Sequence, residues 1–208
     1  WEWVWGWVWV WVWVWVWGWV WVWEWVWVWV WGWGIMTDSE WAELDHVRGW
    51  LSRTEAEALE RYAAGKIVLE IGSYCGKSTI AMARTAMLVV SIDHHRGDSG
   101  TGEADTFTEF RANLERFGVA NKVVPIVADV SLTTPLISRN EFDMAFVDGE
   151  HTYESVMRDL RVATWATNNI IAMHDTHYPD VMRAAEDRGI APFDDIAGTL
   201  GIKRRRKS

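Results

Sequence analysis

Short hydrophobic runs alternate with helix-like segments along residues 36–208. A short apolar run bounded by turn residues is typical of a strand that is buried on both faces of a sheet. Such runs lie at residues 67–69, 87–92, 122–127, 142–147 and 169–173. Helices are predicted at residues 40–64, 80–87, 105–117, 153–160 and 178–188. The alternation predicts an α/β fold with a mostly parallel sheet, helices on both faces and a short C-terminal hairpin at residues 194–202.

Each predicted strand ends in an acidic residue. These acids are Glu70, Asp93, Asp129, Asp148 and, directly after His174, Asp175. In an open α/β sheet the ligand site lies beyond the carboxyl ends of the strands. We therefore expect the acids to converge on one rim of the sheet.

The first strand leads into a glycine turn with the pattern Glu70-x-Gly72-x-x-x-Gly76. A strand, a glycine turn and a helix in this order bring backbone N–H groups close to a ligand. A phosphate-binding P-loop needs four residues between its first glycine and Gly-Lys-Ser, but only three separate Gly72 from Gly76. The dinucleotide-binding fingerprint Gly-x-Gly-x-x-Gly is also not matched, because Ser73-Tyr74 follows the first glycine, Gly72. A phosphate-binding NTPase that uses Gly76-Lys77-Ser78 as a variant loop stays open as an alternative.

Three segments carry more specific patterns. They read Leu-Glu-Ile-Gly-Ser-Tyr-x-Gly-Lys-Ser-Thr at residues 69–79, Phe-Val-Asp-Gly-Glu-His-x-Tyr-Glu at 146–154 and Ala-Met-His-Asp at 172–175. Together they resemble class I S-adenosylmethionine-dependent methyltransferases of the small-molecule O-methyltransferase type, the group of macrocin-type sugar methyltransferases and cephalosporin-hydroxylase-like proteins. The resemblance covers about residues 37–204. It implies a Rossmann-like fold and methyl transfer to a hydroxyl of a small molecule or glycan. A non-catalytic binding module with the same fold is the other alternative.

The resemblance also implies a cofactor and roles for the strand-end residues. Glu70, Gly72 and Gly76 would surround the methionine part of S-adenosylmethionine, Asp93 would hold its ribose, and Asp129 would lie near its adenine. Asp93 lies 23 positions after Glu70, a spacing that suits a second strand end that delivers a carboxylate to a ribose. The complete predicted cofactor-binding set is Glu70, Gly72, Ser73, Gly76, Ser78, Asp93, Asp129 and Asp148.

Candidate catalytic residues follow the fourth and fifth strands. Methyl transfer to a hydroxyl requires alignment of the acceptor and removal of its proton, and we predict that Glu150 or His151 is the general base. A structural role for His151, as the cap of helix 153–160, is the alternative. Asp148, His174 and Asp175 are predicted to bind Mg²⁺ or another divalent cation. His174 is a softer ligand than Mg²⁺ usually takes and leaves the metal open; alternatively, Asp148 binds the cofactor and His174 packs.

Two further segments are candidates for the walls of the site. Trp50, in the segment before the first strand, is predicted to line the pocket. Residues 94–102 form a polar loop after Asp93 that is predicted to gate the substrate site, although a solvated connector fits the same composition. His177 has a weaker claim as a site residue, because a loop position beside Pro179 explains it equally well.

Residues 1–33 place Trp at every odd position, with Val, Gly or Glu between. Strict alternation formally indicates a strand, but strands usually have about 5–6 residues, and Trp prefers membrane interfaces to the bilayer centre. Trp is encoded by TGG, and Val, Gly and Glu each have a codon that begins and ends in G. A drifting TGGGTG repeat read in frame would therefore give this tract. We predict that residues 1–35 are translated upstream repeat outside the native protein, which starts at Met36 and forms one domain over residues 36–208.

Composition excludes several other classes. Two of the 29 acidic residues, Glu2 and Glu24, lie in the tract, which leaves 27 acids against 20 bases in residues 36–208. This negative balance argues against general nucleic-acid binding, and the basic segment at residues 203–207 is interpreted as a solvated terminus. The single cysteine, Cys75, excludes an internal disulfide and favours the reducing cytoplasm. The residues after Met36 are amphipathic and charged and do not match a secretory signal, and we expect no membrane partner.

Overall fold

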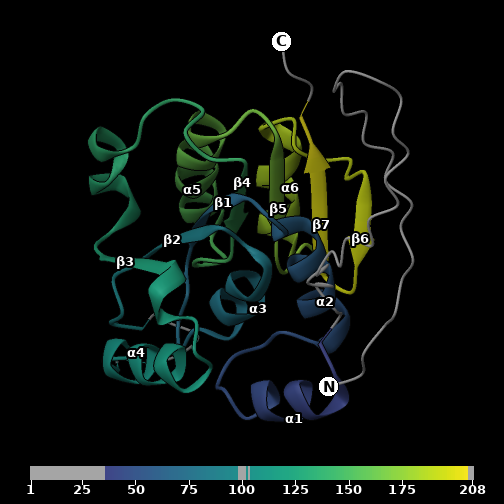
Figure 1. Ribbon diagram of the computed structural model, residues 1–208. Helices are drawn as coiled ribbons and strands as arrows, with labels where there is room; N and C mark the ends of the chain where they lie inside the picture. Colours follow the sequence, from purple (N-terminus) through teal and green to yellow (C-terminus); the bar gives the residue numbers. More distant parts are fainter. Residues whose placement is uncertain (1–35, 98–101, 103, 206–208) are drawn as a thin grey trace, which may run out of the picture. The chain divides into compact units, whose positions relative to one another are not determined.

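A seven-stranded sheet with the order β3-β2-β1-β4-β5-β7-β6 forms the centre of the protein (Figure 1). Its first five strands are parallel: β1 (Ile67–Ile71), β2 (Leu88–Asp93), β3 (Val123–Val127), β4 (Met144–Val147) and β5 (Ile170–Met173). The hairpin of β6 (Asp195–Ala197) and β7 (Leu200–Arg204) adds an antiparallel edge beside β5. The predicted Rossmann-like α/β fold, with its mostly parallel sheet and C-terminal hairpin, is confirmed.

The computed structural model describes residues 36–97, 102 and 104–205. The prediction for the Trp-rich tract, residues 1–35, lies outside the described residues, as does the part of the predicted gate at residues 98–101. Among the residues that the structure describes, no helix is both long enough and apolar enough to span a bilayer.

Helices cover both faces of the sheet. On one face lie α2 (Arg53–Ala63), α3 (Lys77–Thr85) and α4 (Phe107–Arg116), with α1 (Asp38–Asp45) at their edge; on the other lie α5 (Tyr153–Ala166) and α6 (Pro179–Asp187). Short 3₁₀ helices occupy Ala120–Lys122 (η1), Val130–Leu132 (η2) and Thr134–Leu136 (η3). The segment predicted as helix 40–64 is two helices, because Thr37 with Glu40 and Ser52 with Glu55 each form a capping box that starts a new helix.

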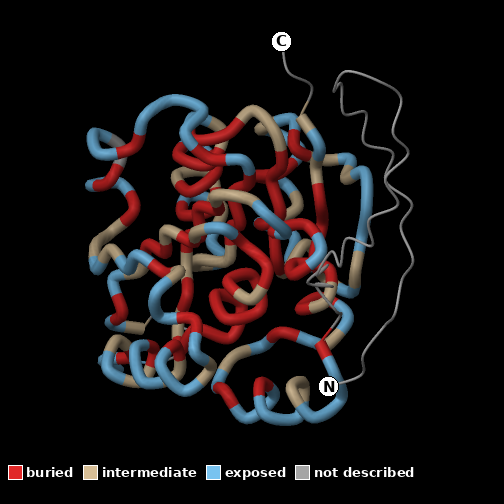
Figure 2. The backbone as a smooth tube through the Cα atoms, in the orientation of Figure 1, coloured by how far each residue is buried: buried red, intermediate tan, exposed pale blue. Residues whose placement is uncertain are grey.

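The period-two geometry of the strands divides the core into two layers. Val68 and Phe146 point to the α2–α3 side, and their neighbours Leu69 and Val147 point to the α5–α6 side. All four are buried, and in Figure 2 the central strands β4 and β5 are buried along their whole length, whereas the edge strands β3 and β6 are largely exposed. Strands with two covered faces carry the near-continuous apolar runs from which they were predicted.

The carboxyl ends of β1 and β4 approach each other closely at Gly72, which follows β1. Gly72 has a φ of 85°, and a Cβ at this position would lie 2.1 Å from the carbonyl oxygen of Asp148. A non-glycine residue would be strained by its dihedral angle and would also collide with backbone. The sheet therefore requires glycine where its strand order reverses.

We predict that Gly72→Ala lowers the free energy of unfolding by about 3 kcal/mol or more, from left-handed strain and overpacking together. Urea denaturation of the purified protein measures this loss. Gly118→Ala is the matched control, because Gly118 has a φ of 67° but nothing lies within 4 Å of its hypothetical Cβ. It should cost only the dihedral strain of about 1–2 kcal/mol. Equal losses in the two variants would contradict the clash at Gly72.

Candidate active site

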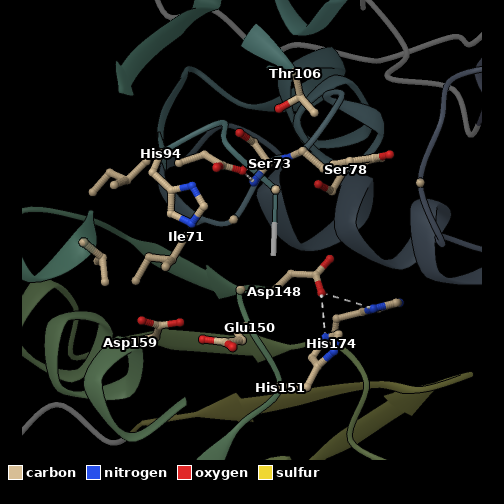
Figure 3. Close-up of a pocket in the computed structure, with 18 of the residues that line it drawn as sticks. Ile71, Ser73, Ser78, His94, Thr106, Asp148, Glu150, His151, Asp159 and His174 are labelled. Atoms are coloured by element: carbon tan, nitrogen blue, oxygen red, sulfur yellow. Dashed lines mark hydrogen bonds and ion pairs between the residues drawn. The ribbon is translucent and has the colours of Figure 1, made fainter. Parts of the chain in front are cut away.

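A cavity of about 370 Å³ opens at the carboxyl edge of the sheet, where β1 and β4 lie side by side (Figure 3). Its volume is within the range of about 300–1,000 Å³ that small-molecule sites occupy. Most of the residues predicted from the sequence converge on this cavity. Its walls include Gly72, Ser73, Ser78, Asp93, Asp129, Asp148, Glu150, His151, His174 and Asp175.

Two of the predicted cofactor residues, Glu70 and Gly76, do not line this cavity. Strand β1 continues one residue past Glu70, and the alternation of side chains turns Glu70 toward α3, where it is fully buried. Its carboxyl accepts hydrogen bonds from Ser78 Oγ at 2.7 Å and Thr79 Oγ1 at 2.6 Å. Burial, partly offset by these hydroxyls, raises the pKa of Glu70 to about 7. Gly76 starts α3 with a φ of 91° and packs against Phe110. Both residues therefore support the glycine turn from the side that faces away from the cavity.

Asp93 and Asp129 organise loops while they face the cavity. The Oδ2 atom of Asp93 accepts hydrogen bonds from the backbone amides of Ser73 at 2.9 Å and Tyr74 at 2.8 Å, and Oδ1 accepts one from His95 at 2.7 Å. The Asp93 carboxylate thus fixes the glycine turn after β1 to the end of β2. Asp129 caps η2 through the backbone amide and hydroxyl of Ser131.

An acidic and imidazole cluster lies at the ends of β4 and β5. His174 Nδ1 is 3.4 Å from Asp148 Oδ1 and 3.3 Å from Asp175 Oδ2, and His151 Nε2 is 3.1 Å from Asp175 Oδ2. Dashed lines in Figure 3 join Asp148 to both imidazoles. One ligand atom each from Asp148, His174 and Asp175 can be chosen so that all three lie within 4.8 Å of one another. This donor set fits a divalent cation that accepts both oxygen and nitrogen ligands.

The carboxylates control the charge of the two histidines. Burial lowers the pKa of His174, but Asp148 and Asp175 outweigh this effect and raise the value to about 11. Asp148 and then Asp175 raise the pKa of His151 to about 9. Burial raises the pKa of Asp175, but His151 and His174 outweigh it and hold that pKa below its ordinary value.

Glu55 of α2 completes this cluster and was not predicted as a site residue. Its Oε2 atom lies 3.4 Å from His174 Nε2, and the carboxylate is almost fully buried. Ser52 donates to Glu55 through its amide and hydroxyl, and Thr199 of the β6–β7 turn does the same. Burial raises the pKa of Glu55, but these donors outweigh it and lower the value to about 2. With Nε2 beside Glu55, His174 presents Nδ1 to the two aspartates.

The helix-cap alternative for His151 is wrong. The N-cap of α5 is Thr152, whose hydroxyl accepts a hydrogen bond from the amide of Ser155. His151 stacks instead on Tyr178, with 5.1 Å between ring centroids. His177 lies 3.6 Å from Asp175 at the edge of the cluster.

The arrangement of Lys77 does not favour the NTPase alternative. Lys77 Nζ turns away from the glycine turn, donates to Asp45 Oδ1 at 3.0 Å and lies 5.4 Å from the Trp41 ring centroid. Ser78, the other P-loop position, donates to Glu70. A phosphate-binding loop requires the lysine beside the phosphates. In this protein the lysine instead links α3 to the α1–α2 segment through its contacts with Asp45 and Trp41.

The α1–α2 loop supplies an aromatic wall. Trp50 lines the cavity with 70% of its surface exposed, and its ring lies 5.7 Å from that of Tyr74. Arg48 donates to Tyr74 Oη at 3.0 Å and forms an ion pair with Glu109 of α4. Tyr74 and Arg48 were missed, because their neighbours in the sequence do not reveal that the loop folds over the glycine turn.

Comparison with known proteins identifies the family. Residues 69–176, a little over half of the chain, match the model of the methyltransferase domain family, and the chain belongs to this family. The fold is similar to cofactor-bound Rv0187 from MTB (22% identity, TM-score 0.62, covering 81% of this chain and 88% of the other).

Two other solved structures share the fold. The O-methyltransferase from Bacillus cereus in complex with SAH is 16% identical, with a TM-score of 0.61 and coverage of 82% and 92%. The O-methyltransferase TomG from Streptomyces achromogenes, involved in tomaymycin synthesis and solved with SAM, is 19% identical, with a TM-score of 0.54 and coverage of 71% of each chain. The protein is thus an enzyme of the methyltransferase class.

We predict that Glu55→Gln lowers the free energy of unfolding by about 2 kcal/mol or more. The carboxylate accepts from four donors on two oxygens, whereas an amide offers one oxygen and turns an NH₂ group toward buried donors, and unpaired buried donors cost about 1–3 kcal/mol each. Chemical denaturation tests this value.

The control for this prediction is Glu57→Gln on the same helix, where the carboxylate pairs with the half-exposed Arg53. Partly exposed ion pairs contribute about 0–1 kcal/mol, so this variant should be close to neutral. Equal stabilities of the two variants would show that the Glu55 network is not structural.

Proposed function

We propose that this enzyme transfers a methyl group from S-adenosylmethionine to a hydroxyl oxygen of a small molecule, with a divalent cation bound beside the acceptor. The observation that carries the proposal is the placement of the Asp148–His174–Asp175 cluster in the same cavity as the glycine turn and Asp93. A cofactor on the glycine turn would reach the cluster with its reactive end. Solved O-methyltransferases of this fold with bound SAM or SAH support the choice of cofactor.

The cofactor would lie along the carboxyl edge of the sheet. Gly72 and Ser73 would contact its methionine part, Asp93 its ribose, and Asp129 the adenine end. Asp93 is already fixed by three backbone amides, and a carboxylate has about four acceptor sites, so one acceptor site is left for a ribose hydroxyl. Such a prearranged carboxylate loses little freedom when the ligand binds.

The reaction forms a bond between the acceptor oxygen and the methyl carbon, breaks the bond between that carbon and sulfur, and releases the hydroxyl proton. S-adenosylmethionine supplies a methyl group that its sulfonium has already activated. Glu150 and His151 line the cavity next to the cluster, and we propose that one of them takes the proton, His151 doing so in its neutral form. His151 is the nearer to Asp148 and Asp175, while Glu150 is held by the hydroxyl of Ser155 at 2.7 Å.

A divalent cation would be held by Asp148, His174 and Asp175. When bound, it lowers the pKa of a hydroxyl that coordinates it. Glu55 would orient His174 for this role, since histidine ligands usually donate their second N–H to a carboxylate. The nitrogen ligand favours Mn²⁺, Co²⁺ or Zn²⁺ over Mg²⁺.

The acceptor class follows from the resemblance and from the site. A phenol or a sugar hydroxyl fits a site that removes a proton beside a cation, and the exposed ring of Trp50 suits a planar acceptor. We propose that the enzyme belongs to the macrocin-type and cephalosporin-hydroxylase-like group. We also propose a cytoplasmic location, which the single cysteine indicates.

We expect calorimetry to detect binding of S-adenosylhomocysteine and no binding of ATP. Asp93→Ala should weaken S-adenosylhomocysteine binding about tenfold or more, because hydrogen bonds to charged groups contribute about 1.5–3 kcal/mol. Glu115→Ala, an exposed acid on α4 away from the cavity, is the control and should bind like the wild type. If the wild-type protein does not bind S-adenosylhomocysteine, the proposed function is refuted.

For the cation, we expect Mn²⁺ to bind to the wild-type protein more tightly than Mg²⁺ in the same calorimeter. Asp175→Asn should weaken Mn²⁺ binding by about tenfold or more, since it removes one charged ligand. Asp180→Asn, on the exposed start of α6, is the matched control. Unchanged Mn²⁺ affinity in Asp175→Asn would rule out the proposed ligand set.

A further inference from the structure

Asp159 is a buried carboxyl group that the proposed chemistry does not use. It projects from α5, is 2% exposed and lines the cavity. Its Oδ1 atom has no hydrogen-bond partner among the described residues, and the nearest cationic atom, Arg158 Nε, is 3.5 Å away and also lacks a hydrogen-bond partner there. Buried polar atoms nearly always have partners. A buried carboxyl oxygen that lacks a hydrogen bond on a cavity wall therefore points to a ligand group.

The position of Asp159 selects one part of the cofactor. In Figure 3 Asp159 lies at the opposite end of the labelled residues from His151 and His174, with Glu150 between them. Helix α5 packs there against η2, the turn that Asp129 caps after β3. If the reactive methyl lies at the His174 end and the ribose lies at Asp93, the adenine extends toward β3. Asp129 and Asp159 then meet the same end of the cofactor.

The charges around Asp159 favour its uncharged form. Arg158 on its own helix is a cation beside it, while Asp129 at the start of η2 and Glu150 in the β4–α5 loop are both acidic. Burial raises the pKa of Asp159 to about 7, with Asp129 and Glu150 adding to the increase and Arg158 opposing it. A Cβ at Gly149 would lie 2.6 Å from Asp159 Oδ2, so the glycine leaves space for the carboxyl beside this loop.

We infer that Asp159 binds the Watson–Crick edge of the cofactor's adenine as an uncharged carboxylic acid. Adenine offers a donor at its N6 amino group and an acceptor at N1. A protonated carboxyl offers the complementary pair, a carbonyl oxygen that accepts and a hydroxyl that donates, whereas a carboxylate only accepts. This assignment rests on the proposed function, because it requires S-adenosylmethionine in the cavity. It adds a residue that recognises the adenine base of the cofactor.

The first test measures S-adenosylhomocysteine binding against pH. Ionisation of Asp159 removes the donor to N1, so wild-type affinity should fall about tenfold between pH 6 and pH 8 for a group that titrates near pH 7. Asp159→Asn carries an amide that accepts and donates without titrating, so its affinity should match the wild type at pH 6 and stay constant to pH 8. Asp180→Asn is the matched control and should keep the wild-type pH dependence. A pH dependence that persists in Asp159→Asn would overturn the inference.

The second test removes the ligand atom instead of the residue. S-(1-deazaadenosyl)homocysteine lacks the N1 acceptor, and the wild type at pH 6 should bind it about tenfold more weakly than S-adenosylhomocysteine, the value of one hydrogen bond of about 1.4 kcal/mol. Asp159→Ala should bind both ligands equally, since the two deletions remove the same interaction. A purely structural Asp159 would instead leave the preference for S-adenosylhomocysteine intact in Asp159→Ala.

The outcomes separate this inference from the proposed function. Wild-type protein that binds neither ligand at any pH contradicts the proposed function itself. Wild-type protein that binds both ligands equally and without pH dependence supports the cofactor but refutes the role of Asp159. If Asp159→Ala does not fold, the pH profile of Asp159→Asn still decides the question.

Discussion

The site depends on the continuation of parallel hydrogen bonding one residue past the ends of the central strands. The amide of Asp148 donates to Ile71 at 2.8 Å, and the amide of His174 donates to Val147 at 3.1 Å. These bonds keep Asp148 and His174 at the level of the glycine turn after β1. The approach is close enough that Gly72 cannot carry a side chain. The convergence of the carboxylates is therefore a property of the sheet register, and the loops only extend it.

Bringing several charges to one edge requires compensation, and the protein provides it by pairing. His174 lies between Asp148 and Asp175 on one side and Glu55 on the other. Unpaired buried charges would be costly, whereas a network with satisfied hydrogen bonds holds its members in fixed positions. Since Glu55 comes from α2 and its partner Thr199 from the β6–β7 hairpin, segments distant in the sequence meet beside the imidazole of His174.

Two buried acids show how environment separates roles for one kind of side chain. Glu70 is satisfied by the hydroxyls of Ser78 and Thr79, which makes it part of the joint between β1 and α3. Asp159 is also buried, but its Oδ1 atom has no hydrogen-bond partner among the described residues and only the ion pair with Arg158, and acidic groups lie around it. The first arrangement is complete without a ligand, and the second is not.

The sequence by itself determined the sheet, the order of strands and helices, and most of the strand-end residues at the site. Apolar runs report burial on both sheet faces, and an acid after a parallel strand must lie at the carboxyl edge. The sequence could not show that Glu70 faces away from the cavity, because β1 continues one residue further, to Ile71, and this turns the Glu70 side chain toward α3. Nor could it reveal Glu55 or the fate of Lys77, since their partners His174, Thr199 and Asp45 are distant in the chain. Local patterns decide which elements form, but only the packing of those elements decides which side chains meet.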